Sequence, residues 1–179
     1  MALRSVVYKV DLGISDLDRQ YYATHNLTLA RHPSETDERL MVRLLAFILH
    51  ASESLEFGKG LSSDDEPALW DRDLTGAVTR WIEVGQPDER LLRRACGKAD
   101  EVVLYAYGRA VDVWWRQNAS ALRKLDKLRV WKLDESICAD LLRFAERNMQ
   151  LQATLQDGEL MLSGEGDTVQ IRPVLMGDA

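Results

Sequence analysis

The chain has 179 residues, of which 46% are hydrophobic and 29% are charged, a composition typical of one globular domain with a substantial core. Lys plus Arg is 23 and Asp plus Glu is 29, so the net charge is −6 at pH 7. Such an acidic balance argues against tight unspecific binding to duplex DNA, which needs many phosphate contacts.

Several features of the sequence bear on the compartment. No apolar run reaches the roughly 18 residues that a membrane span needs, and the N-terminus has no apolar signal region. Cys96 and Cys138 are far apart and lack CxxC spacing, which predicts reduced thiols. We therefore expect a single domain over residues 1–179 in the cytoplasm, with no membrane partner and with an oligomeric state that the sequence leaves open.

Two segments near the N-terminus alternate in hydrophobicity. In SVVYKVDL the apolar residues fall on one face, and HNLTLARHP alternates through His25, Leu27 and Leu29. A period of two predicts half-buried strands, which we expect to form a hairpin or an adjacent pair.

A helix is predicted next, with Ser34 as its N-cap. Its apolar residues recur at helical spacing, and Glu38 lies at the edge of that stripe, near the first turn. Glu38 is therefore a carboxylate near the buried face. The stripe consists of Leu40, Met41, Leu44, Leu45 and Ile48.

The middle of the chain alternates between strand and helix patterns. SLEFGKG predicts a short strand and GLSSDDEP a polar loop, and ALWDRDLTGAVTRWIEVG predicts a hairpin that turns at Thr75-Gly76. GQPDERLLRRACGKA predicts a helix opened by Pro87. EVVLYAYG predicts a strand buried on both faces.

The last third adds further α/β elements and ends in strands. GRAVDVWWRQNASALRKL and DESICADLLRFAERN predict helices, and LRVWKL between them predicts a strand. The C-terminal stretch, MQLQATLQDGELMLSGEGDTVQIRPVLM, predicts three strands with a turn at Gln156-Asp157-Gly158. The whole order is that of an α/β or mixed α+β fold.

Glu83 is the candidate functional residue of the central hairpin. A turn at Thr75-Gly76 places it opposite residue 68, within one position, and on the same strand face as Trp81. Glu66 would be its diagonal neighbour, and Glu38 would approach from the preceding helix. Converging carboxylates repel one another unless a divalent cation neutralises them, and hard oxygen ligands suit Mg²⁺ or Mn²⁺.

An ordinary ion pair is the alternative interpretation of Glu83. The following helix carries Arg90, Arg93 and Arg94, any of which could pair with it. Structural ion pairs outnumber active sites, so the residues alone leave both interpretations open.

Five stretches of the sequence are distinctive: LTLARHPSETDERLMVRLLAF, LEFGKGLSSDDEPALW, WIEVGQPDERLLRRACGKADEVVLYAYG, VWWRQN and MQLQATLQDGELMLS. They resemble one bacterial family, the YaeQ family, and the likeness covers nearly all 179 residues. The order helix, three-strand meander, helix, strand over residues 35–107 also looks like the core of the PD-(D/E)XK, or restriction-endonuclease-like, nucleases. That resemblance implies such a core with extra N-terminal strands and a C-terminal β-meander, and metal-dependent cleavage of nucleic-acid phosphodiesters.

The nuclease motif contains a Pro-Asp pair and, later, a Glu followed two residues on by a Lys. Glu83 matches its acidic position, and Glu38 matches the helix glutamate often seen upstream. Ala68 follows Pro67 where the aspartate is expected, and Gly85 stands where the lysine is expected. Two defining side chains are therefore absent from their expected positions.

Neighbouring residues offer replacements for both. Glu66, or Asp71 or Asp73 in another register, would replace the aspartate, and Glu66 with Glu83 would hold Mg²⁺ or Mn²⁺. A cation from the following helix would replace the lysine, although arginine is a poor general base because it stays protonated. The candidates for this cation are Arg93, Arg94 and Lys98, and Gln86 would orient a water molecule.

Two other functions remain open. The first is a catalytically inactive member that binds nucleic acid or protein, which Ala68 and Gly85 favour. The second is an interaction module anchored by Trp114 or Trp115, of which one is expected in the core and the other at the surface. A basic run is either a nucleic-acid contact or a solvated helix end; it comprises Arg123, Lys124, Lys127, Arg129 and Lys132.

Overall fold

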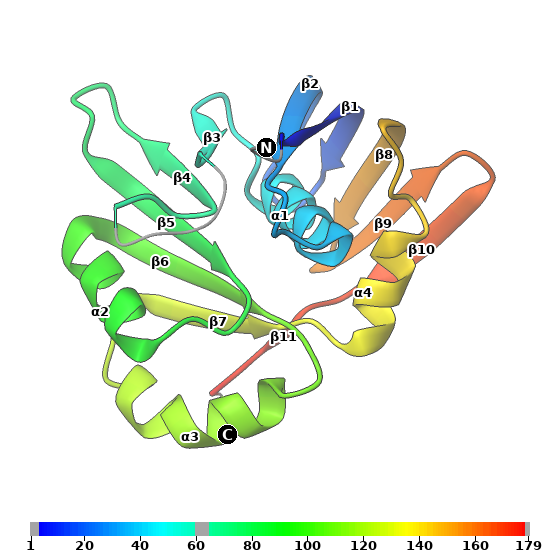
Figure 1. The fold of residues 1–179 in the computed structure, drawn as a ribbon. Helices are drawn as coiled ribbons and strands as arrows, with labels where there is room; N and C mark the ends of the chain where they lie inside the picture. Colours follow the sequence, from blue (N-terminus) through cyan, green and yellow to red (C-terminus); the bar gives the residue numbers. More distant parts are fainter. Residues whose placement is uncertain (1–3, 60–64, 178–179) are drawn as a thin grey trace.

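The computed structural model describes residues 4–59 and 65–177, which form two mixed sheets and four helices (Figure 1). The mixed α+β class expected from the sequence is confirmed. In chain order the elements are β1 (Val6–Asp16), β2 (Tyr21–Arg31), α1 (Asp37–His50), β3 (Leu55–Phe57), β4 (Leu69–Arg72), β5 (Val78–Val84), α2 (Glu89–Lys98), β6 (Ala99–Ala106), α3 (Val111–Leu122), β7 (Leu128–Lys132), α4 (Glu135–Leu142), β8 (Asn148–Gln156), β9 (Glu159–Gly164), β10 (Asp167–Ile171) and β11 (Val174–Leu175).

The first sheet has five strands in the order β10-β9-β8-β1-β2. β1 pairs with β2 antiparallel along its whole length, as the two alternating segments predict. On its other side β1 pairs with β8 in parallel, so the two ends of the chain meet in the middle of this sheet. The β8–β9 hairpin turns at Asp157 and Gly158, whose φ angles of 54° and 75° suit a two-residue hairpin turn.

The second sheet has six strands in the order β11-β7-β6-β5-β4-β3. β5, β6 and β7 run parallel, while β3, β4 and β5 form an antiparallel meander. The predicted turn between β4 and β5 is confirmed by a 3.0 Å hydrogen bond from the Gly76 N–H to the Asp73 carbonyl. β6 is buried on both faces, as its continuous apolar run predicts.

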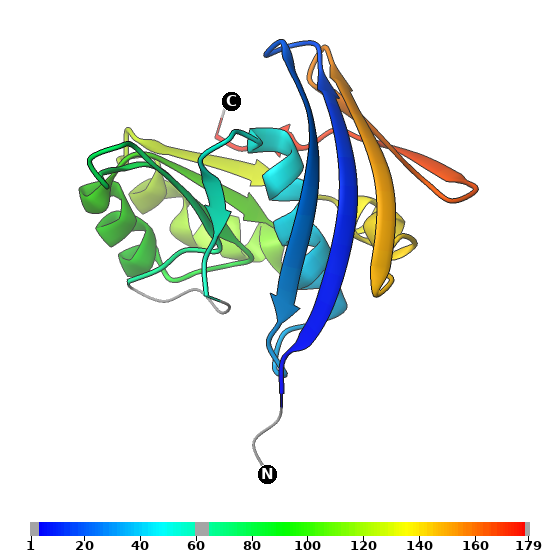
Figure 2. The same cartoon turned by 90° about the horizontal axis from the view of Figure 1, so that it is seen from above.

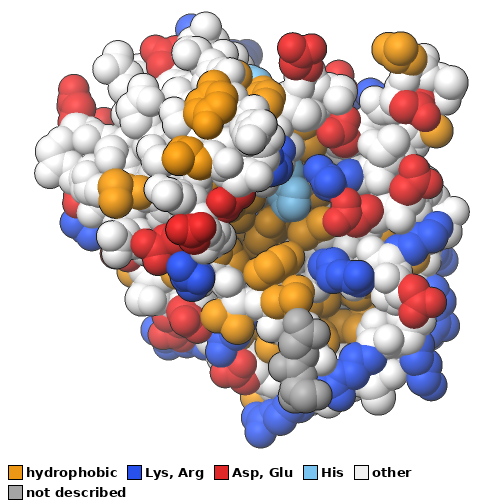
Figure 3. Space-filling view, turned by 180° about the vertical axis from the view of Figure 1, so that it is seen from behind, with side chains coloured by type: hydrophobic (Ala, Val, Ile, Leu, Met, Phe, Trp, Pro, Cys, Tyr) orange, Lys and Arg blue, Asp and Glu red, His pale blue; other side chains and the backbone are white. Residues whose placement is uncertain are grey.

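Helix α1 lies between the two sheets, and α2 and α3 cover the opposite face of the six-stranded sheet (Figures 1 and 2). The hydrophobic residues accordingly form two clusters. One joins α1 and α4 to both sheets, and the other joins α2 and α3 to the six-stranded sheet. The back of the molecule is hollowed, with hydrophobic side chains on the floor and charged side chains of both signs around the rim (Figure 3).

The predicted N-cap of α1 is wrong by two residues. The helix begins at Asp37, and the side chain of Thr36 accepts a hydrogen bond from the Arg39 N–H. The Ser34 hydroxyl instead lies 2.7 Å from Nδ1 of His32. The predicted stripe of α1 is confirmed, since all five of its apolar residues are at most 1% exposed.

Strand β11 is an element that the sequence did not predict. It returns from the five-stranded sheet to pair with β7. The predicted polar loop GLSSDDEP lies partly outside the described residues. Within residues 4–59 and 65–177, no helix combines the length and apolar character needed to cross a membrane.

Candidate functional site

Glu83 lies on β5 and is only 1% exposed. Its Oε1 accepts a 2.8 Å hydrogen bond from Nε1 of Trp81. Residues two apart on a strand share a face, and this contact confirms the prediction that the two side chains lie on the same face. The Trp81 ring packs edge-on against Trp70, with ring centroids 6.1 Å apart. The carboxylate is therefore set into an aromatic surface on a central strand.

A lysine from α2 lies beside this pair. Nζ of Lys98 is 5.6 Å from the centroid of the Trp81 ring, a distance at which a cation is attracted to the aromatic face. The same Nζ is 3.8 Å from the carboxylate of Asp65. We refer to Asp65, Trp81, Glu83 and Lys98 as the Glu83 cluster. It combines buried negative charge with a cation on the face of the sheet that α2 covers.

Glu66 lies in the loop that leads into β4. Its carboxylate accepts a 3.1 Å hydrogen bond from the backbone N–H of Lys59 and lies 3.7 Å from Nζ of the same residue. Its side chain is 24% exposed. The register that pairs Leu69 with Ile82 puts Ala68 level with Glu83, as the hairpin predicts. Glu66 is therefore near the cluster in the chain, although its carboxylate is held by Lys59.

Gly85 has a φ of +101°, and its N–H donates to the Tyr105 carbonyl at 2.9 Å. At a positive φ of this size, any residue with a Cβ atom strains the backbone, whereas glycine does not. A lysine at the motif position would have to adopt that strained conformation. The backbone conformation at residue 85 therefore explains why glycine stands there. The cation near Glu83 comes from α2 instead, as Lys98.

The structure does not bring Glu38 to Glu83. Ile82 and Val84, on the other face of β5, pack in the hydrophobic cluster of α1, whereas Trp81 packs in the cluster of α2 and α3. Since alternate residues of a strand point to opposite faces, the sheet separates Glu83 from α1. Glu38 instead faces Cys138 of α4, where burial first, and then the charge and hydrogen bond of Glu38, raise the pKa of the thiol to about 12.

Two other predicted residues occupy the ends of this region. Nε2 of Gln86 donates to the carbonyl of Tyr107 at 2.9 Å, so its amide holds the end of β6. Arg94 is exposed on α2. Arg93 forms an ion pair with Glu89 of its own helix. The alternative interpretation of the sequence paired Glu83 with an arginine of α2, but Arg93 pairs with Glu89 instead.

The donors available for a metal are carboxylates. Across residues 4–59 and 65–177, no three His, Cys, Asp or Glu side chains are grouped so that they could hold a metal ion. Mg²⁺ commonly uses only one or two protein carboxylates, with water and substrate phosphates completing its shell. Glu83 has the donor type of such a minimal set but is only 1% exposed, and a cage made entirely of protein ligands does not fit the described residues.

Residues 1–173 match the family model described as YaeQ protein. The chain belongs to the YaeQ family. It is 47% identical over 173 residues to the uncharacterized protein YaeQ of Salmonella typhi, covering 96% of each chain. It is 46% identical over 172 residues to that of Escherichia coli strain K12, covering 96% of this chain and 95% of the relative.

Crystal structures of two YaeQ proteins have the same fold. The protein from Xanthomonas axonopodis pv. citri has a TM-score of 0.92 and 47% identity, over 98% of this chain and 99% of that one. The protein from Pseudomonas syringae has a TM-score of 0.92 and 34% identity, over 98% and 97% of the two chains. The two-sheet architecture is thus shared with other YaeQ proteins at this level of identity.

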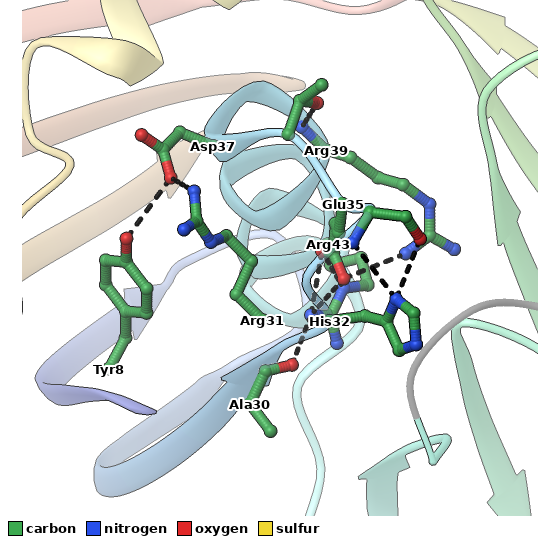
Figure 4. A network of polar contacts seen from close by, with 10 residues as sticks. Tyr8, Ala30, Arg31, His32, Glu35, Asp37, Arg39 and Arg43 are labelled. Carbon is green, nitrogen blue, oxygen red and sulfur yellow. Dashed lines mark hydrogen bonds and ion pairs between the residues drawn. The ribbon is translucent and has the colours of Figure 1, made fainter. Parts of the chain in front are cut away.

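This member of the YaeQ family contains a charged network that was not expected from the sequence (Figure 4). Glu35 and Arg43 are 4% and 1% exposed. Arg43 donates hydrogen bonds to the carboxylate of Glu35 and, from Nη2, a 3.1 Å bond to the Ala30 carbonyl. Nη1 of Arg39 approaches the same carboxylate at 3.4 Å. The only signal in the sequence is the four-residue spacing of these charges, which also suits a solvated helix face.

A histidine–tyrosine pair was not expected either. Nε2 of His50 lies 2.6 Å from the hydroxyl of Tyr105. Burial, followed by the charges of Arg80 and Arg19, lowers the pKa of His50 to about 3. Burial raises the pKa of Tyr105. His50 is therefore a neutral, structural imidazole in this member of the YaeQ family at physiological pH.

Both tryptophans of α3 are half-buried against the second hydrophobic cluster. The expectation that one lies in the core and the other at the surface is therefore wrong. Nε1 of Trp114 donates to the Pro87 carbonyl at 3.2 Å, and the guanidinium of Arg123 lies 5.7 Å from the Trp115 ring centroid. Much of the basic run is structural: Nζ of Lys127 donates to the Cys96 and Ala99 carbonyls at 3.1 Å each, and Lys132 pairs with Asp112 at 2.8 Å.

Proposed function

We propose that this YaeQ chain is a nuclease-like protein that acts on phosphodiester bonds of nucleic acid at the Glu83 cluster. The order α1, β3–β4–β5, α2, β6 supports a restriction-endonuclease-like core, because an antiparallel meander is followed by a helix and by a strand parallel to β5. Contacts between α1 and α4 link the parts of the chain that build the two sheets, which supports a single domain over residues 1–179. Both cysteines are free, which supports a reducing, cytoplasmic location.

The observation that carries the proposal is the Glu83–Trp81–Lys98 arrangement. A buried carboxylate lies at the acidic position of the motif, and an ammonium group from the next helix lies over the same indole. A positively charged side chain at such a site can stabilise the charge that develops on a transferring phosphoryl group. Lys98 would therefore replace the motif lysine that Gly85 excludes.

Glu83 and Glu66 would hold a Mg²⁺ or Mn²⁺ ion, with water and phosphate oxygens as the other ligands. Such an ion activates water and neutralises phosphate charge. Arg94 and Lys98 would contact the phosphate backbone, and Gln86 would keep the end of β6 in place through the Tyr107 carbonyl.

A second candidate rests on the burial of Glu83. At 1% exposure and with Trp81 as a hydrogen-bond donor, its carboxylate also suits a structural role. A catalytically inactive member that kept this fold would bind nucleic acid or a protein partner. The nuclease candidate cleaves its nucleic acid and the inactive candidate does not, but both would use the same binding surface.

Cleavage of single- and double-stranded DNA and RNA in Mg²⁺ and in Mn²⁺ tests the proposal. Glu83→Gln keeps an oxygen that accepts the Trp81 hydrogen bond but removes the charge, and we expect it to reduce cutting by about 100-fold or more. Glu101→Gln on the neighbouring strand β6, whose carboxylate pairs with Arg80, is the matched control and should cut normally. Cutting that survives Glu83→Gln would refute the proposed site.

Absence of cutting on every substrate would favour the binding candidate. Fluorescence anisotropy with labelled oligonucleotides then tests nucleic acid as the partner. If phosphate contacts are made, Arg94→Met should weaken binding and reduce the slope of log K against log salt by about one.

A further inference from the structure

Strand β2 forms one edge of the five-stranded sheet and runs for 11 residues. Its register with β1 is continuous from Tyr21 to Arg31, without a bulge. A long, regular edge strand presents a row of backbone donors and acceptors that can pair with another strand.

The register shows which residues face outward. The N–H of Lys9 donates to the Arg147 carbonyl at 2.8 Å, so it points toward the β8 side of β1. Lys9 is paired with Thr28, and in an antiparallel ladder the partner of a residue that points away must also point away. The bond from Arg43 to the Ala30 carbonyl on the outer side of β2 agrees with this assignment.

The backbone groups of Tyr22, Thr24, Asn26 and Thr28 therefore point out of the sheet. Within the part of the chain that the structure describes, no hydrogen bond joins these N–H or carbonyl groups to another element. The four residues alternate along the edge with the spacing that one further strand would match.

The inner face of β2 is also incompletely covered. Its residues Tyr21, Ala23, His25 and Leu27 are only half-buried. At the opposite edge of the sheet the inner residues of β10 are sealed, with Val169 at 5% and Ile171 at 0% exposure. The two edges of this sheet thus differ. These inner side chains are half-exposed on the edge strand β2 and buried on the edge strand β10.

Two of the usual protective devices, proline and charged side chains, are missing from the sequence of this edge. Residues 21–30 contain no proline and no Lys, Arg, Asp or Glu, and natural proteins use such residues to block edge pairing. The charged residues Arg19 and Arg31 lie outside this stretch and are paired with Asp16 and Asp37. The edge is therefore neutral and carries no formal charge that would repel a partner strand.

We propose that β2 accepts an extended peptide segment of another protein as a sixth strand of this sheet. The peptide backbone would pair with Tyr22, Thr24, Asn26 and Thr28, and apolar side chains at every second position would cover Ala23 and Leu27. Strand addition of this kind takes affinity from the backbone ladder and specificity from alternate side chains.

The position of β2 favours a single segment over a second copy of the chain. β2 is the strand of its sheet nearest to the six-stranded sheet (Figures 1 and 2). A second copy pairing here would bring its own six-stranded sheet toward this one, whereas one added strand needs a width of only about 4.8 Å.

The test uses the full chain and a synthetic peptide, VVYKVDLGISD, which is the sequence of β1, the strand that pairs with the inner edge of β2. Hydrogen exchange is measured for each backbone amide with and without the peptide. We expect the amides of Tyr22, Thr24, Asn26 and Thr28 to exchange more slowly in its presence, by about tenfold or more. A peptide with proline in place of its third valine, the residue corresponding to Val10, should give no protection.

Asn26→Pro is the matched variant, because the N–H that it removes points away from β1 and the β1–β2 ladder keeps its bonds. It should abolish peptide binding and leave the circular dichroism spectrum unchanged. If the proline variant fails to fold, Thr24→Lys takes its place. This variant adds a charge to the edge and should weaken peptide binding.

Two results would overturn the proposal. One is the absence of protection of these four amides at saturating peptide. The other is protection of the same amides in the free protein together with a dimeric mass in sedimentation, which would assign the edge to self-association.

Discussion

Arg43 donates two hydrogen bonds to Glu35, from Nε to Oε1 at 2.9 Å and from Nη2 to Oε2 at 3.1 Å. The side chains are 2% and 0% exposed. Two charges out of water depend on each other, because removing one leaves the other without its main compensation. The pair joins the segment before α1 to the middle of that helix, and so fixes how the chain enters the layer between the sheets.

Arg43→Met should therefore lower the free energy of unfolding by about 3–5 kcal/mol. The double variant Glu35→Gln/Arg43→Met should lose less, since neither charge of this buried pair remains without the other. Urea unfolding at pH 7 measures both. Arg172→Met, which removes an exposed pair with Glu159 at 3.5 Å, should change stability by less than about 1 kcal/mol. Equal losses in the single and double variants would contradict this account.

Trp81→Phe removes the indole donor that bonds to Glu83. A buried carboxylate that loses a hydrogen bond costs about 1–3 kcal/mol, and we expect that loss in urea unfolding. Trp70→Phe is the control, because Trp70 is half-buried and its indole makes no hydrogen bond to the described residues. If Glu83→Gln were combined with Trp81→Phe, the additional cost should shrink, since losing the Trp81 hydrogen bond costs a neutral amide less than a carboxylate.

Stability should fall in mild acid because of His50. Its pKa is about 3 in the folded protein, against an ordinary value of 6.5. Between these values the unfolded chain binds a proton that the folded protein does not, so the free energy of unfolding decreases as the pH falls below 6.5, by up to about 1.4 kcal/mol per pH unit. The stabilisation is fully present above pH 6.5.

His50→Gln keeps a polar partner for the Tyr105 hydroxyl and should flatten that pH dependence. Urea unfolding at pH 7, 6, 5 and 4.5 provides the comparison. His25, whose pKa burial also lowers, should account for part of the remaining slope. His32→Gln, at an exposed position, is the control, and a profile as flat as that of His50→Gln would argue against the assignment to His50.

Two glycine substitutions should have opposite effects. Gly97 lies in α2, where an added Cβ would meet nothing within 4 Å beyond its own helix backbone and chain neighbours, so Gly97→Ala should stabilise the protein by about 0.5–1 kcal/mol. Gly85 has equal space but a φ of +101°, so Gly85→Ala should destabilise it by about 1 kcal/mol or more. Thermal unfolding of both variants is the measurement, and stabilisation by Gly85→Ala would show that the backbone there is not strained.

Local patterns explain what the sequence predicted. The period of two in β1 and β2, the helical stripe of α1 and the turn at Gly76 depend on neighbours in the chain, and each was found as expected. The shared face of Trp81 and Glu83 followed from the same alternation. These features need no knowledge of distant contacts.

Apart from the N-cap of α1, which lies at Thr36 and not at Ser34, the errors concern relations between distant segments. The stripe of α1 showed that Glu38 lies at its edge, but only the packing of Ile82 and Val84 against α1 shows that Glu83 faces the other side of the sheet. The burial of Glu35 with Arg43 likewise depends on how the segment before α1 folds over the helix. Charges at helical spacing look the same in either environment.

The parallel pairing of β1 with β8 has a consequence for how the protein is made. Asp18 accepts hydrogen bonds from the N–H groups of Asp157 and Gly158, which lie 139 and 140 residues further along the chain. During synthesis, the β1–β2 hairpin therefore emerges long before the strand that completes its other side. Contacts this remote slow folding, because a large loop must close before they form. Until residues 148–156 leave the ribosome, β1 is itself an open edge, and an unpaired edge of this kind is exposed to incorrect strand pairing.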